Sequence, residues 1–286
     1  MALALVTGTS SGIGLATAMA LARAGHSVAA TMRNLDGGAE IRKMAAAEKL
    51  PIHLVALNVD DDASVRDAFA RVVAEHGPID VLVNNAGIPG GGVVEETTID
   101  RFRQVMETNF FGALRCAKAV IPSMRERRHG TIVNVSSVAG RIALPSHSSY
   151  AASKWALEAA SESLAQELRP FNVRVAIVEP GVIATPISSR APPPTAESLY
   201  PFRKRLMATF AASRAKPVPP SVVGDAIRDI VASDSLRLRY PVGPDAELWL
   251  SARANKTDEQ VVLEGNETDA EFAVRVKREL GIDVKL

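Results

Sequence analysis

The stretch HSSYAASKWALEAASESLAQEL, residues 147–168, places a phenol and an ammonium one helical turn apart. Tyr150 and Lys154 are separated by three small residues, so both side chains have room on one helix face. An isolated phenol has a pKa of about 10, and a nearby positive charge would bring this pKa toward neutral pH. The spacing fits either an acid–base pair or a purely structural Tyr–Lys pair.

A glycine-rich turn, TGTSSGIG, occupies residues 7–14 between a predicted strand and a predicted helix. In that setting Gly8 permits a tight exit from the strand, Gly12 lets a ligand approach the backbone, and Gly14 lets the helix pack closely on the sheet. The N–H groups at the helix N-terminus would then face an anion such as a pyrophosphate. No Lys-Ser/Thr pair follows the last glycine, so the turn is not a P-loop.

The end of the second predicted strand, ATMRN at residues 30–34, bears on which nucleotide binds. A carboxylate there would accept hydrogen bonds from the ribose hydroxyls and repel a 2′-phosphate. This chain has Met32 and Arg33 instead, with Asp36 farther along. A guanidinium suits a phosphate, so the sequence favours NADP(H), with NAD(H) as the alternative cofactor. In the other interpretation, Arg33 is only a solvated loop residue.

Strands rich in Val, Ile, Leu and Ala alternate with helices over the first 185 residues. We predict strands at 2–7, 26–33, 52–60, 79–87, 130–137 and 172–181, and helices at 15–24, 38–49, 61–77, 99–128 and 149–168. This alternation predicts an α/β, Rossmann-type, doubly wound parallel sheet with helices on both faces. A further helix at 222–233 and an edge-type strand at 236–243 bring the sheet to about seven strands. We expect a single domain over residues 1–286.

The region 186–220 differs from what precedes it, because it holds eight of the seventeen prolines around one short predicted helix, 202–213. It follows the carboxyl end of a strand, where ligands bind in doubly wound folds. We predict a substrate loop or lid here, and the alternative is a surface excursion without function. Residues 245–286 form a polar, charged C-terminal extension.

The overall composition restricts the class of protein. Hydrophobic residues make up 47% and charged residues 23% of the chain, with a net charge of +1, which is typical of a soluble globular protein and gives no basic field for nucleic acid. The single cysteine, Cys116, has apolar neighbours and is expected to be a buried thiol. We expect no membrane span, no targeting segment and no metal site, and a cytoplasmic protein.

Six motifs together resemble a classical short-chain dehydrogenase/reductase (SDR). They are TGTSSGIG, NNAG at 84–87, Asn109, NVSS at 134–137, YAASK at 150–154 and PG at 180–181, in order over about residues 2–185. The resemblance implies a catalytic tetrad of Asn109, Ser137, Tyr150 and Lys154. Ser137 is selected over Ser136 because the family's serine lies thirteen residues before the tyrosine.

The resemblance also implies a role for each member of the tetrad. Tyr150 would exchange a proton with the oxygen of the reacting carbonyl or alcohol, and Ser137 would hold that oxygen. Lys154 would lower the pKa of Tyr150 and bind the nicotinamide ribose. Asn109 would help to hold a water molecule of a proton relay.

The predicted cofactor contacts come from five turns and the catalytic helix. Asn58 stands where the family commonly has an aspartate, and Asn85 has a purely structural role as its alternative. The full set is Gly8, Ser10, Ser11, Gly12, Ile13, Gly14, Arg33, Asn58, Val59, Asn85, Ala86, Gly87, Tyr150, Lys154, Pro180, Gly181, Val182 and Thr185.

The sequence gives less information about the substrate than about the cofactor or the catalytic residues. Apolar residues that could form its pocket are Leu144, Ile187, Leu199, Tyr200, Phe202, Leu206 and Met207, and basic residues that could favour an acidic group are Arg190, Arg203, Lys204 and Arg205. We expect an apolar or steroid-like carbonyl compound or secondary alcohol. His147 either touches this substrate or faces solvent.

Three functions compete for this chain. The first is an NADPH-dependent ketone or aldehyde reductase, which Arg33 and the intact tetrad favour. The second is an NAD-linked secondary alcohol dehydrogenase, and the third is a nucleotide-binding sensor without turnover. The resemblance further implies a homodimer or homotetramer formed through the helices at 99–128 and 149–168, with small-molecule substrates.

Overall fold

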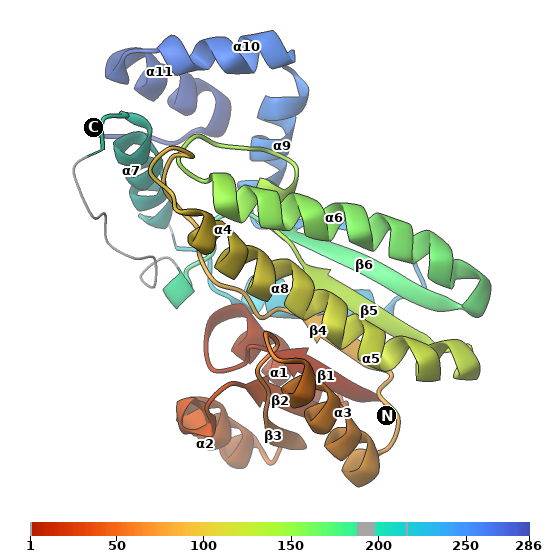
Figure 1. Ribbon diagram of the computed structural model, residues 1–286. Helices are drawn as coiled ribbons and strands as arrows, with labels where there is room; N and C mark the ends of the chain where they lie inside the picture. Colours follow the sequence, from red (N-terminus) through yellow and green to blue (C-terminus); the bar gives the residue numbers. More distant parts are fainter. Residues whose placement is uncertain (1, 188–197, 216) are drawn as a thin grey trace.

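Seven parallel strands form one sheet through the centre of the protein (Figure 1). This computed structural model describes residues 2–187, 198–215 and 217–286. The strands are β1 (Leu3–Thr7), β2 (Ser27–Met32), β3 (Ile52–Ala56), β4 (Val81–Asn84), β5 (Gly130–Val135), β6 (Val173–Pro180) and β7 (Arg239–Val242). Their order is β3-β2-β1-β4-β5-β6-β7, so the chain reverses its direction of winding between β1 and β4. In such sheets the ligand crevice lies outside the carboxyl ends of the strands at this reversal.

Helices cover both faces of the sheet, as the predicted α/β fold requires. They are α1 (Gly12–Arg23), α2 (Ala39–Glu48), α3 (Asp62–His76), α4 (Ile99–Met106), α5 (Gly112–Arg127), α6 (Ser148–Leu168), α7 (Phe202–Arg214), α8 (Ser221–Ala232), α9 (Ala246–Ala254), α10 (Asp258–Leu263) and α11 (Asp269–Leu280). One apolar core joins the sheet to α3, α5 and α6, and a second joins it to α1, α2 and α8. Two buried faces explain why the strands read as continuous apolar runs in the sequence.

The long helix predicted at 99–128 is divided in the structure. Between α4 and α5 the chain forms a π-helical segment, Glu107–Phe111, which carries the buried Asn109. π-Helical turns of this kind are often found at functional sites. Within the described residues, no helix is long and apolar enough to cross a membrane.

The C-terminal extension forms a third, smaller core at one end of the protein. Trp249 of α9 and Val276 and Leu280 of α11 pack against Val138 and Ile142, which follow β5. In Figure 1 the three helices α9, α10 and α11 lie together beside α7. The extension therefore covers the end of the sheet that carries the carboxyl ends of the strands.

Candidate active site

The glycine turn between β1 and α1 has the backbone geometry that its sequence predicts. Gly8 and Gly12 have φ angles of +72° and +61°, a region that residues with a side chain rarely adopt. A Cβ atom on Gly14 would lie 2.3 Å from the carbonyl oxygen of Gly8, so this position needs glycine for close packing. Gly8 and Gly12 line the cavity described below, whereas Gly14 does not. The structure thus shows the predicted packing role of Gly14, and its contact with the cofactor stays a prediction.

The turn after β4 is tied to the glycine turn by Asn85. The backbone N–H groups of Asn85 and Ala86 both donate to Thr7 Oγ1 at 2.9 Å. The Asn85 side chain donates to the carbonyl oxygen of Thr7 at 2.8 Å. Asn85 thus has the structural role that was its alternative, although the residue also lines the cavity.

A cavity of about 840 Å³ opens at the carboxyl ends of the strands. Residues from β2, β5 and β6 and from the turns after β1 to β6 contribute to it, together with α6, α7 and α9. The predicted site residues that line it are Gly8, Ser10, Ser11, Gly12, Ile13, Arg33, Asn58, Val59, Asn85, Ala86, Gly87, Ser137, Tyr150, Lys154, Pro180, Gly181, Val182 and Thr185. Residues from distant parts of the chain thus surround one space large enough for a dinucleotide and a small substrate.

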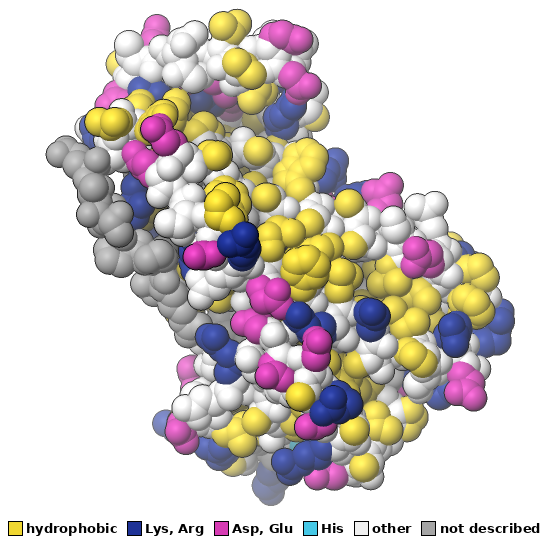
Figure 2. Space-filling view, viewed as in Figure 1, with side chains coloured by type: hydrophobic (Ala, Val, Ile, Leu, Met, Phe, Trp, Pro, Cys, Tyr) yellow, Lys and Arg dark blue, Asp and Glu magenta, His cyan; other side chains and the backbone are white. Residues whose placement is uncertain are grey.

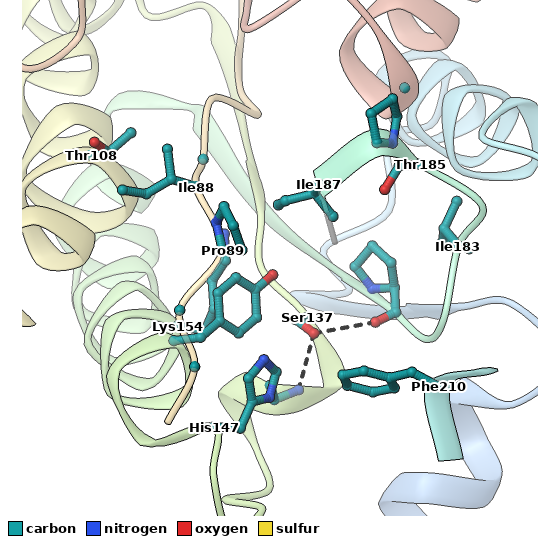
Figure 3. Close-up of a pocket in the computed structure, with 18 of the residues that line it drawn as sticks. Ile88, Pro89, Thr108, Ser137, His147, Lys154, Ile183, Thr185, Ile187 and Phe210 are labelled. Carbon is teal, nitrogen blue, oxygen red and sulfur yellow. Dashed lines mark hydrogen bonds between the residues drawn. The ribbon is translucent and has the colours of Figure 1, made fainter. Parts of the chain in front are cut away.

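Three members of the predicted tetrad meet in this cavity. Ser137, just after β5, accepts a hydrogen bond from the Ala139 N–H at 3.2 Å and donates to the Pro180 carbonyl at 3.5 Å (Figure 3). Tyr150 and Lys154 lie in the first two turns of α6, and Lys154 Nζ is 5.6 Å from the centroid of the Tyr150 ring. Lys154 Nζ also donates to the Val135 carbonyl oxygen at 2.9 Å.

Burial controls the titration of these two side chains. It raises the pKa of Tyr150 to about 12, and the hydrogen bond with Ser137 opposes that shift. It also lowers the pKa of Lys154 to about 8, opposed by the negative charge of Glu158. The lowering of the Tyr150 pKa that was expected from Lys154 is not seen here: burial sets the direction of the shift, and Nζ is bonded to the Val135 carbonyl. At neutral pH Tyr150 is therefore a proton donor and Lys154 is charged.

Asn109 lies behind the cavity wall and does not line it. Its Oδ1 accepts from the Ile88 N–H at 2.8 Å, and its Nδ2 donates to the Ile88 carbonyl at 3.1 Å and to Ser153 Oγ at 3.0 Å. The side chain thus joins the loop after β4 to α6, close to Tyr150, whose carbonyl accepts from Ser153 Oγ at 2.7 Å. Its role in a water relay stays a prediction.

The substrate side of the cavity is mostly apolar, as expected. Of the predicted residues, Leu144, Ile187, Leu199, Leu206 and Met207 line it. Tyr200 and Phe202 do not line it, and they stack on each other with ring centroids 6.3 Å apart.

Two aromatic residues on the substrate side of the cavity, which we call the substrate wall, were not predicted from the sequence. Phe210 follows Leu206 and Met207 at helical spacing, and this pattern could have found it. Trp249 comes from the C-terminal extension, and no sequence signal connects it to the site.

The predicted basic cluster divides between two surroundings. Arg203 lines the cavity, and Arg190 lies outside the described residues. Lys204 Nζ and Arg205 Nε both contact Asp269, at 3.2 and 2.8 Å, so these two cations hold α7 to α11. The expectation that Lys204 and Arg205 favour an acidic substrate group is wrong, because their charges are already paired.

His147 is partly buried rather than exposed on the surface. Its ring stacks on that of Tyr150 with centroids 4.8 Å apart, and the edge of Phe210 approaches it at 5.8 Å. It lines the cavity, and burial lowers its pKa to about 4. The alternative that places His147 at the substrate is therefore the one that the structure supports.

Arg33 lies at the nucleotide end of the cavity. It is exposed directly after β2, lines the cavity, and makes no hydrogen bond or ion pair with any described residue. Asp60, which was not predicted from the sequence, also lines this end, and its Oδ2 accepts from Thr108 Oγ1 at 3.1 Å. The glycine turn, the helix N-terminus and an available guanidinium together fit a phosphorylated dinucleotide.

Comparison with known proteins assigns the chain to a family. A family model described as short chain dehydrogenase matches residues 2–195. The chain belongs to the short-chain dehydrogenase/reductase family. It is 38% identical over 261 residues to the uncharacterized oxidoreductase YusZ of Bacillus subtilis, covering 88% of this chain and 92% of that protein.

Solved structures agree with this assignment. A short-chain dehydrogenase from Streptomyces avermitilis superposes with a TM-score of 0.81 at 33% identity, covering 93% of this chain and 96% of that one. A single-substitution variant of actinorhodin polyketide ketoreductase with NADPH gives a TM-score of 0.74 at 29% identity, covering 84% and 95%. The protein is thus an SDR-family NAD(P)-dependent oxidoreductase.

Proposed function

We propose that the protein is an NADPH-dependent reductase of apolar ketones or aldehydes. The observation that carries this proposal is the meeting of Ser137, a protonated Tyr150 and Lys154 in one cavity with Arg33, which has no partner among the described residues. Two hydroxyl donors beside one another suit an oxygen that gains negative charge during reaction. An available cation at the nucleotide end suits a 2′-phosphate.

The reaction follows from what each side chain can donate. The nicotinamide, when bound, supplies hydride to the carbonyl carbon. The Ser137 hydroxyl donates only a long 3.5 Å bond to the Pro180 carbonyl, so it can turn this proton to the substrate oxygen and polarise it. The Tyr150 hydroxyl gives its proton to the resulting alkoxide, and the positive charge of Lys154 stabilises the phenolate that remains.

The choice of NADPH over NADH rests on Arg33 and on the absence of an acid at its neighbour. Met32, at the end of β2, is apolar, and Arg33 comes directly after it. NADPH is the nucleotide in the structure of the related actinorhodin ketoreductase. The apolar wall of Leu144, Leu206 and Phe210 supports a substrate of moderate size with little charge.

Nucleotide titration tests this proposal. We expect NADPH to bind at least about tenfold more tightly than NADH, because a phosphate–guanidinium contact is a charge-assisted hydrogen bond. Arg33→Ala should remove this preference, and Arg66→Ala, on the exposed face of α3, is the matched control that should not. NADH binding as tight as NADPH binding would contradict the proposal and favour an NAD-linked alcohol dehydrogenase. Tight binding without turnover on a broad carbonyl panel would favour a sensor.

We also propose that the protein forms a homodimer or homotetramer through α5 and α6. Figure 2 shows apolar side chains gathered over these helices. Phe111, directly before α5, is 44% exposed, and Trp155 of α6 is 51% exposed. Exposed aromatic residues on adjoining elements are typical of protein contacts. Light scattering on the eluting protein should give the mass of two or four chains, and a mass near 30.4 kDa would contradict this proposal.

A further inference from the structure

His147 is fixed in place beside the catalytic phenol. It is the residue before α6, and its ring lies nearly parallel to that of Tyr150, at an interplanar angle of 17°. On another side the edge of Phe210 meets it at 72° (Figure 3). Its backbone N–H donates to the Leu144 carbonyl at 3.2 Å. With two rings and a backbone bond around it, the imidazole has little freedom to turn.

The two nitrogens of this ring have different surroundings. Nδ1 is occluded and has no hydrogen-bond partner among the described residues. Nε2 also lacks a partner in this part of the chain, but it is not among the occluded atoms. Because His147 lines the cavity, Nε2 is the nitrogen that a ligand there reaches. Burial keeps the ring neutral at physiological pH by lowering its pKa, so Nε2 can offer one directed hydrogen bond.

Nε2 of His147 has no role in the proposed reaction, because other groups perform each step. Ser137 and Tyr150 both act on the oxygen of the reacting carbonyl, and Lys154 is bonded to the Val135 carbonyl. Leu144 and Phe210, which also line the cavity, are apolar. A substrate that displaces water from this part of the cavity would therefore have to pair with Nε2, or leave that nitrogen without a hydrogen-bond partner.

We propose that His147 is a specificity-determining residue that binds a second polar atom of the substrate. Stacking at 4.8 Å holds the imidazole and the phenol within reach of one small substrate group. The second atom therefore lies two or three bonds from the reacting carbonyl. The substrate class is a 1,2- or 1,3-dicarbonyl compound or a hydroxyketone with an apolar remainder. This inference rests on the proposed carbonyl reduction.

A matched pair of ketones tests the inference. 1-Phenyl-1,2-propanedione and propiophenone have the same carbon skeleton and differ in one oxygen. The measurement is kcat/KM for each ketone with NADPH, in the wild type and in His147→Phe, which keeps a flat ring against Tyr150 but has no nitrogen. Taking the ratio of the two ketones in each protein cancels the greater intrinsic reactivity of the dione. The ratio should fall about tenfold or more in His147→Phe, mainly through the dione.

Two further variants separate a hydrogen bond from a packing effect. His147→Asn keeps a hydrogen-bonding side chain and should retain much more of the dione preference than His147→Phe. His129→Phe, an exposed position after α5, is the control and should behave as the wild type. An unchanged ratio in His147→Phe, or an equal loss in the Phe and Asn variants, would overturn the inference alone. Reduction of neither ketone by the wild type would overturn the proposed carbonyl reduction and with it this inference.

Discussion

The nucleotide end and the substrate wall of this cavity are built in different ways. At the nucleotide end, backbone groups and glycines set the geometry: β1 is buried along its whole length, and Gly8, Gly14 and Asn85 are in close contact. At the substrate wall, side chains hold α7 and α9, through the ion pair of Arg205 with Asp269 and the small core around Trp249. We infer from this difference that side chains of the substrate wall can be substituted without disturbing the sheet that positions the nucleotide and the catalytic residues.

Substitution at the nucleotide end should have the largest effect. Gly14→Ala places a methyl group 2.3 Å from the Gly8 carbonyl oxygen and 2.4 Å from Asn85 Nδ2, where backbone must move. We expect a loss of about 3 kcal/mol in the free energy of unfolding and no measurable NADPH binding. Denaturant unfolding and nucleotide titration measure the two effects. Gly265→Ala, with no atom within 4 Å of the new methyl, is the control, and equal behaviour of the two variants would refute the close-packing argument.

The titration of Lys154 should appear in the rate of reduction. Burial lowers its pKa to about 8, so its charge is present below that pH and lost above it. The pKa of Tyr150, raised to about 12, keeps the proton donor intact across the same range. We therefore expect kcat/KM for NADPH, which reports the free enzyme, to be level below about pH 8 and to fall up to tenfold per unit above it. A rate that rises through pH 8 would contradict this assignment.

Loosening the substrate wall should have a smaller and more selective effect. Arg205 is 5% exposed and binds both Asp269 and the Glu267 carbonyl, so Arg205→Leu removes the buried ion pair between α7 and α11 and leaves only the exposed pair of Lys204 with Asp269. We expect KM for the ketone to rise about fivefold, because Leu206, Met207 and Phe210 lose their fixed positions, while the Kd of NADPH stays within about twofold. Arg237→Leu, on an exposed loop, is the control. A parallel loss of NADPH affinity would show that the two regions are not separable.

The same division explains what could be predicted from the sequence. The strands and the glycine turn were predicted because local patterns of Val, Ile and Gly determine them, and Tyr150 and Lys154 were found by their spacing on one helix. Two features were not predicted: the π-helical segment that carries Asn109, behind the cavity wall, and Asp60 on the cavity surface at the nucleotide end. Both depend on packing between elements rather than on a local pattern.

The substrate wall was predicted less well, because it forms between distant segments. Trp249 reaches the cavity from nearly a hundred residues after Tyr150, and no periodicity relates the two. Lys204 and Arg205 were assigned to the substrate because their charge was visible in the sequence, but the partner Asp269 lies in the C-terminal extension. The stacking of His147 on Tyr150 likewise depends on how the loop enters α6.

The most direct test of the central claim, that Tyr150 performs acid catalysis on a carbonyl at this site, is single-turnover transfer of deuterium from 4-deuterated NADPH to propiophenone. Tyr150→Phe should bind NADPH within about twofold of the wild type and transfer deuterium about a thousandfold more slowly, since only the proton donor is removed. Tyr240→Phe, in β7 and away from the cavity, should match the wild type. Transfer by Tyr150→Phe at the wild-type rate would contradict the account.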